Sequence, residues 1–122
     1  MPYILIADDD ENFAAMVRES LRSKGYDADV VKDSFAFAAA VAKRLPSAAI
    51  IDMQMPGGGA LMALRSLRSG TQAGVIPAII CSGMPIEQTL KWFPGAARLD
   101  VLQKPLDLDA LLRTLAALLA QP

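Results

Sequence analysis

The chain has 122 residues, 53% of them hydrophobic and 20% charged, and its 12 Lys and Arg against 13 Asp and Glu give a net charge of −1. This composition excludes a disordered chain and indicates one domain over residues 1–122, and the balanced charge argues against binding to nucleic acid or to an anionic membrane. His is absent and Cys occurs once, which excludes histidine chemistry and an internal disulfide. No apolar run is long enough to span a membrane, and Met1–Ala7 is too short for a signal peptide, so we expect a cytoplasmic protein.

The first half of the chain alternates short apolar runs with segments of helical period. Tyr3–Ala7 is an apolar run that stops at Asp8, as expected for a strand buried on both faces. A helix should follow and stop at Gly25, before a second strand over residues 28–31 and a third over residues 48–51 that also ends on an acid. Ser34 is expected to cap the intervening helix, with Phe35, Ala38, Val41 and Leu45 on its apolar face and Pro46 beyond its end.

The second half continues the same alternation. A helix marked by leucines over residues 61–67 should end near Gly70, and residues 75–81 and 99–103 should form the fourth and fifth strands. Residues 86–93 should form a helix with Trp92 and Phe93 half-buried, and Cys81 should be a small buried hydrophobe. A last helix, with leucines over residues 108–119, should be capped by Asp107.

Strands that alternate with helices predict an α/β fold with a parallel sheet covered on both faces. In such sheets, ligands bind at the carboxyl ends of the strands. Asp8, Asp9, Asp52, Ser82 and Lys104 each follow or end an apolar run, so we expect these five side chains to meet at that end of the sheet.

The expected cluster suits one kind of chemistry. Carboxylates a few ångströms apart repel each other by roughly 4 kcal/mol per close pair near a protein surface, and a hard divalent ion such as Mg2+ relieves that repulsion. A lysine and a hydroxyl beside the acids suit phosphoryl transfer, in which positioning and charge neutralisation supply most of the catalysis. Because the chain has no histidine, a carboxylate would be the nucleophile and would form an aspartyl phosphate.

Four motifs carry a family resemblance over essentially the whole chain. They are Ile4–Asp10, Ile50–Pro56, Ile79–Gly83 and Leu102–Pro105. In this order, each at the end of an expected strand, they resemble the receiver (CheY-like) domain of two-component response regulators. The resemblance implies a single doubly wound, flavodoxin-like (βα)5 domain with strand order 2-1-3-4-5.

The resemblance also implies a role for each site residue. Asp52 would be the phosphoacceptor. The Mg2+ cofactor would be held directly by Asp9, Asp52 and the backbone carbonyl of Gln54, and through water by Asp8. Ser82 and Lys104 would contact the phosphoryl group, and the bond before Pro105 is a candidate for a cis peptide.

A receiver of this kind would be a switch and not an enzyme in the usual sense. Its catalysis would be limited to its own phosphorylation and slow dephosphorylation. The phosphoryl group would come from a sensor histidine kinase or a phosphotransfer protein, and the phosphorylated form would bind a downstream protein that the sequence does not identify.

Three positions depart from the family pattern. Gly57–Gly59 replace the usual polar residue and single glycine, which makes the start of the third helix uncertain and predicts a loop that is costly to order. Val101 stands where receivers often carry a moving aromatic ring, so we expect readout to use residues 83–93 instead. Ala7 replaces a branched residue before the acid pair.

Two alternatives stay open at this point. A phosphatase of the haloacid-dehalogenase type would use Asp8 and Asp10, then a serine and a lysine, but it also needs an acidic pair beyond the lysine, and Asp107 and Asp109 should instead begin a helix. A receiver-like scaffold would bind its partner without phosphorylation. A flavin site is disfavoured, because acids follow the first strand where a phosphate group would need small and hydroxyl residues.

Overall fold

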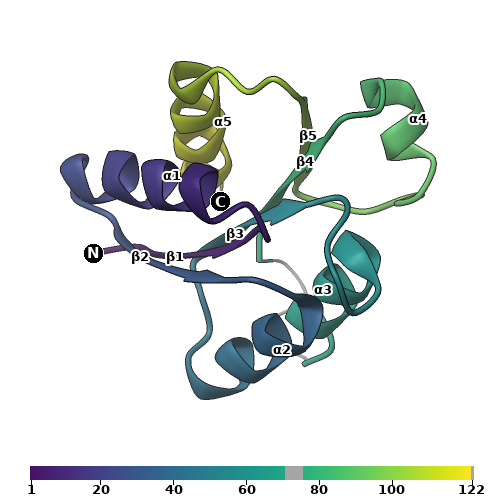
Figure 1. Cartoon of the computed structure of the whole chain (residues 1–122), viewed down its shortest axis with the longest axis horizontal. Coiled ribbons are helices and arrows are strands. Elements are labelled where there is room, and N and C mark those ends of the chain that lie inside the picture. Colours follow the sequence, from purple (N-terminus) through teal and green to yellow (C-terminus); the bar gives the residue numbers. More distant parts are fainter. Residues whose placement is uncertain (71–75, 122) are drawn as a thin grey trace.

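The computed structural model describes residues 1–70 and 76–121, and within them the chain forms one α/β domain (Figure 1). A five-stranded parallel sheet has the order β2-β1-β3-β4-β5, which confirms the predicted flavodoxin-like topology. The strands are β1 (Tyr3–Ala7), β2 (Asp27–Val31), β3 (Ala48–Asp52), β4 (Ala78–Ser82) and β5 (Leu99–Gln103).

Helices cover both faces of the sheet. In Figure 1, α1 and α5 lie on one face and α2 and α3 on the other, while α4 lies beside β5 at the sheet's edge. The helices are α1 (Glu11–Ser23), α2 (Ser34–Lys43), α3 (Gly59–Leu67), α4 (Ile86–Leu90) and α5 (Leu108–Ala120).

The three central strands are apolar up to the polar residues that end β3 and β4, because both of their faces are covered. All five residues of β1, of β3 and of β4 are buried. Successive side chains alternate between the two faces of a strand, so each strand contributes to two cores. Ile4, Ile6 and Ile50 pack with α1 and α5, while Leu5, Ala49 and Ile51 pack with α2 and α3.

The prediction for α2 was wrong in its cap and in part of its face, since Val41 is buried as expected but Phe35 is not. Asp33 is the N-cap, and its side chain accepts a hydrogen bond from the Ala36 N–H at 2.7 Å. The buried residues are Ser34, Phe37 and Val41, whereas Phe35 is 76% exposed. An alanine-rich helix offers several apolar faces of similar strength, so its sequence periodicity did not decide which face is buried.

Two other boundaries differ from the prediction. Ladder pairing in β4 begins at Ala78, after Pro77, which has no N–H to donate to a neighbouring strand; Val75 lies outside the described residues. The helix α4 ends at Leu90, and turns closed by bonds from the Trp92 N–H to the Thr89 carbonyl and from the Phe93 N–H to the Leu90 carbonyl follow it.

The aromatic pair after α4 is split rather than half-buried. The turns after α4 leave Trp92 55% exposed, while Phe93 is buried against the α2–α3 side of the sheet. Cys81 is buried as predicted, and burial raises the pKa of its thiol to about 12, with the nearby Asp52 carboxylate adding to the rise.

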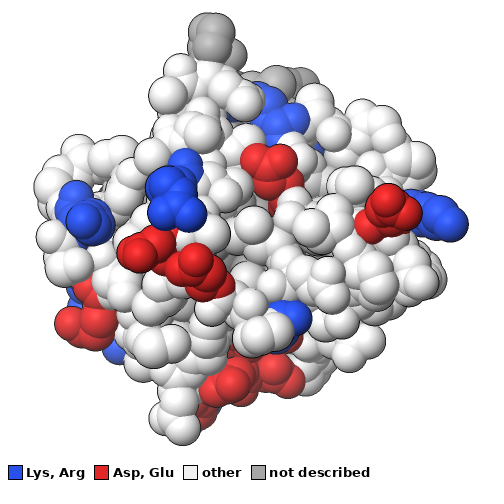
Figure 2. All heavy atoms as spheres, turned by 90° about the horizontal axis from the view of Figure 1, so that it is seen from above, with Lys and Arg blue, Asp and Glu red and all other residues white. Residues whose placement is uncertain are grey.

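Neither a helix that could span a membrane nor, on the face drawn in Figure 2, a single basic patch is found in the described part of the chain. None of the helices in residues 1–70 and 76–121 combines the length and hydropathy needed to cross a bilayer. On the face seen from the side of α1 and α5, Lys and Arg are interspersed with Asp and Glu (Figure 2).

Candidate functional site

Hydrogen bonds that continue the sheet beyond its strands position the residues of the site. The Asp8 N–H donates to the Val31 carbonyl at 3.0 Å, and the Met53 N–H donates to the Cys81 carbonyl at 2.8 Å. The Lys104 N–H donates to the Ser82 carbonyl at 2.7 Å. These bonds tie the first residues of the loops to the ends of the strands.

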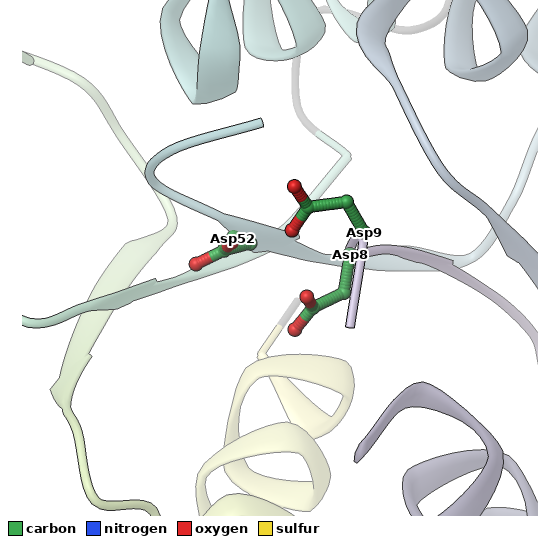
Figure 3. Close-up of side chains that lie close together, drawn as sticks. All are labelled: Asp8, Asp9 and Asp52. Atoms are coloured by element: carbon green, nitrogen blue, oxygen red, sulfur yellow. The ribbon is translucent and has the colours of Figure 1, made fainter. Parts of the chain in front are cut away.

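Three carboxylates gather at the ends of β1 and β3 (Figure 3). Asp8, Asp9 and Asp52 each bring a carboxylate oxygen within 4.8 Å of the other two. Asp8 and Asp52 are buried and Asp9 is exposed. The group therefore has two fixed members beneath one that solvent reaches, a donor set of hard oxygens that suits Mg2+.

The surroundings of the Asp8 carboxylate disfavour its charged form. Burial raises its pKa above the ordinary value, and the negative charge of Asp52 raises it further. A hydrogen bond from the Asp10 N–H at 2.9 Å and the charge of Lys104 oppose this rise. The folded chain holds Asp8 in an environment that disfavours its charged form.

Lys104 is the cation of the site. Its Nζ lies 2.8 Å from Asp52 Oδ1, and its side chain is about a third exposed whereas that of Asp52 is 8% exposed. Burial alone lowers the pKa of Lys104, but the hydrogen bond to Asp52 and the charges of Asp52 and Asp8 raise it overall. The ammonium group is therefore held charged against the buried carboxylate.

The Ser82 hydroxyl is held by two hydrogen bonds. Its oxygen accepts from the Met84 N–H at 3.0 Å and from the Thr89 hydroxyl at 2.8 Å. Ser82 and Thr89 are 1% and 0% exposed. Sequence reasoning placed Ser82 here but missed Thr89, because a lone threonine in a short helix carries no motif.

A cleft of about 300 Å3 opens over Asp52, Ser82 and Lys104. Ser82, Asp52 and Lys104 line it together with Gln54, whose backbone carbonyl the sequence analysis proposed as a metal ligand. All five side chains expected at the carboxyl end of the sheet are thus found there. The Lys104–Pro105 peptide bond is cis.

A phosphatase of the haloacid-dehalogenase type would also require Asp10, Asp107 and Asp109. In this structure Asp10 and Asp107 are helix caps and Asp109 lies in α5. The Asp10 side chain caps α1 by accepting from the Phe13 N–H at 3.1 Å. Asp107 caps α5 by accepting from the Asp109 N–H at 2.9 Å. Within the described residues, the one group of three or more carboxylates close enough to hold an ion is Asp8, Asp9 and Asp52.

The family model "Response regulator receiver domain" matches residues 4–116. The chain belongs to the receiver domain family. Among curated relatives, the receiver is 28% identical over 120 residues to the protein PilH of Pseudomonas aeruginosa, covering 98% of this chain and 99% of PilH. It is also 28% identical over 120 residues to the DNA-binding dual master transcriptional regulator RpaA of Synechocystis, covering 98% of this chain but 49% of RpaA, so it spans about half the length of that relative.

A solved structure matches the fold over nearly the whole chain. The receiver domain of the sensor histidine kinase PA1611 from Pseudomonas aeruginosa, described with a magnesium ion coordinated in its active site cleft, superposes with a TM-score of 0.86. The identity is 22%, with 98% of each chain covered. At this identity the likeness establishes the shared fold.

Proposed function

We propose that this receiver accepts a phosphoryl group on Asp52 and signals through a protein interaction that depends on the phosphorylation. One observation carries the proposal: in an open cleft, the buried Asp52 carboxylate is bonded to Lys104 at 2.8 Å while Asp8 and Asp9 lie beside it. A carboxylate and an ammonium group in one cleft, with further acids beside the carboxylate, are what phosphoryl transfer to a protein carboxylate requires.

The transfer is a displacement at phosphorus. A carboxylate oxygen of Asp52 attacks the phosphorus of a phosphohistidine on a sensor histidine kinase or phosphotransfer protein. The bond from phosphorus to the imidazole nitrogen breaks, its electron pair stays on the imidazole, and an acyl phosphate is left on Asp52. Lys104 and Ser82 would bind phosphoryl oxygens, a role supported by their lining the cleft together with Asp52.

Mg2+ fits the donor set that the chain offers. Asp9, Asp52 and the Gln54 carbonyl would hold it, with Asp8 acting through water, and these are hard oxygen donors of the kind that Mg2+ prefers. When bound, the ion would neutralise part of the charge of the carboxylates and of the phosphoryl oxygens. The magnesium ion described for the PA1611 receiver supports this choice of metal.

For the downstream readout we propose the class of partner, a protein. A phosphorylated receiver would bind a protein partner, and a location in the cytoplasm would give it access to histidine kinases. Self-phosphorylation from a small donor and slow loss of the phosphoryl group would be its catalytic activity.

Acetyl phosphate tests the proposal directly. With Mg2+, the chain should gain one phosphoryl group by mass, and Asp52→Asn should gain none. Asp100→Asn serves as the matched control, since Asp100 is an exposed carboxylate on β5 outside the cleft, and it should be modified like the wild type.

The same experiment separates the alternatives. Phosphorylation of Asp52→Asn to the wild-type extent would refute the assignment of the acceptor. Repeated turnover of a generic phosphate ester would instead indicate a phosphatase, and a wild-type chain that takes up no phosphoryl group would indicate a scaffold.

A further inference from the structure

Thr89 gives α4 a direct hydrogen bond to the site. We propose that Thr89 is a positioning residue: its hydroxyl orients the Ser82 hydroxyl toward the phosphoryl group and couples phosphorylation to α4. This inference rests on the proposed function, because it needs a phosphoryl group on Asp52.

The hydrogen bonds of the Ser82 hydroxyl determine where its proton can go. A hydroxyl oxygen has two lone pairs and one proton. The lone pairs of the Ser82 oxygen accept from the Thr89 hydroxyl at 2.8 Å and from the Met84 N–H at 3.0 Å. Its proton is left to donate, and the cleft that Ser82 lines with Asp52 and Lys104 is where an acceptor would appear. Thr89 thus makes Ser82 a donor aimed at the phosphoryl site.

Burial makes the pair effective. Ser82 and Thr89 are 1% and 0% exposed, so bulk water does not compete for their bond. A polar pair with this little exposure depends on its own hydrogen bonds, and the loss of one leaves an unsatisfied group. The orientation of Ser82 is therefore set by protein atoms.

The Thr89 hydroxyl has a second possible acceptor, the Pro85 carbonyl, which links it to the start of α4. The Thr89 oxygen also lies 3.2 Å from the Pro85 carbonyl, so its one proton can go to Ser82 or to the turn that begins α4. When Ser82 donates to a phosphoryl oxygen, its own oxygen becomes a stronger acceptor through hydrogen-bond cooperativity. The Thr89 proton is then drawn to Ser82 and away from Pro85.

The short length of α4 lets this single bond matter. The helix has five residues, too few to be stable without tertiary contacts. Val101, at the position where receivers often use an aromatic ring, is buried and carries no ring. A change at Thr89 would therefore reach residues 86–93, which lie within the segment 83–93 proposed from the sequence for the readout, without a moving aromatic side chain.

The test uses beryllofluoride with Mg2+ as a phosphoryl analogue. Thr89→Val keeps the shape of the side chain and removes the hydroxyl, and Thr89→Ser keeps the hydroxyl. We expect Thr89→Val to bind beryllofluoride about fivefold more weakly, the effect of one lost hydrogen bond, and to show reduced amide shifts over residues 86–93. Thr89→Ser should restore both, and Thr114→Val, the same substitution on α5, should behave like the wild type.

Other outcomes would overturn the proposal. Wild-type affinity together with wild-type amide shifts in Thr89→Val would show that Thr89 only fills space. If Thr89→Val does not fold, Thr89→Ala, which fits any space that threonine fills, gives the same comparison. If the wild type binds no beryllofluoride and takes no phosphoryl group from acetyl phosphate, the proposed function fails and this inference fails with it.

Discussion

At the scale of single residues, the clustered carboxylates that the proposed function needs make the folded state less stable. Lys104 pairs with Asp52 at 2.8 Å, but Asp8 and Asp9 add two further carboxylates within 4.8 Å. Burial raises the pKa of Asp8, and a hydrogen bond from the Asp10 N–H offsets only part of that rise. A carboxylate kept where its charge is disfavoured is typical of a functional site.

Asp8→Asn should therefore stabilise the fold in Mg2+-free buffer at pH 7. The amide oxygen can still accept from the Asp10 N–H, while the negative charge beside Asp52 is gone. We expect a gain of about 1 kcal/mol in the free energy of unfolding, the size of a water-screened interaction between close charges. Urea denaturation of both proteins measures it.

The pH dependence of this gain follows from the direction of the pKa shift. A carboxyl group whose pKa is raised on folding binds its proton more tightly in the folded chain, so stability is lost as the pH rises from the ordinary value of 3.8 through the raised one. The advantage of Asp8→Asn should be near zero at about pH 3 and complete at neutral pH. Asp9→Asn, at an exposed position, should gain less. An equal gain at all pH values would contradict this account.

At the scale of elements, burial on both faces made the strands easier to predict than the helices. The run Tyr3–Ala7 has the predicted bounds, because a buried parallel strand is apolar until its end. Leu99–Gln103 also has the predicted bounds, although β5 is an edge strand on which Asp100 is exposed. The face of α2 was predicted only in part: Val41 is buried as expected, but Phe35 is exposed, since alanines on several sides made Phe35 and Phe37 equivalent in the pattern. Only the packing of Phe37 on the sheet distinguishes them.

The loop from β3 to α3 depends on glycine in a way that the sequence only suggested. Gly57, Gly58 and Gly59 all have a positive φ, between 66° and 97°. A Cβ on Gly59 would lie 2.7 Å from the Met53 carbonyl oxygen, and that carbonyl accepts from the Ala60 N–H at 3.2 Å. The positive φ angles of these three glycines let the backbone change direction before α3 begins at Gly59.

Gly59→Ala should destabilise the fold by about 1–3 kcal/mol, because it adds both a strained φ and a backbone collision. Gly70→Ala is the matched control: a Cβ at Gly70 meets nothing within 4 Å, so this variant should be within about 0.5 kcal/mol of the wild type. Thermal and urea unfolding measure both. Equal stability of Gly59→Ala and Gly70→Ala would show that the loop can adjust without cost.

At the scale of the whole molecule, the topology assembles the site from distant parts of the chain. Parallel strands place their carboxyl ends at one edge, so the acids after β1 and at the end of β3 meet the lysine after β5. Sequence position alone predicted this assembly once the strands were identified. It did not predict the contact between Thr89 and Ser82, which depends on how α4 packs against the end of β4.

Metal binding at this edge should stabilise the entire domain. A ligand that binds the folded chain alone adds about 2.7 kcal/mol at a concentration 100 times its dissociation constant. Mg2+ should therefore raise the free energy of unfolding measured in urea, and a chelator should reverse the gain. Asp9→Asn is the control, because it removes one carboxylate of the cluster at an exposed position, where the substitution should change the stability of the metal-free protein little. If Asp9→Asn gains as much from Mg2+ as the wild type, or if NaCl at equal ionic strength gives the same gain, the ion does not bind at the three carboxylates.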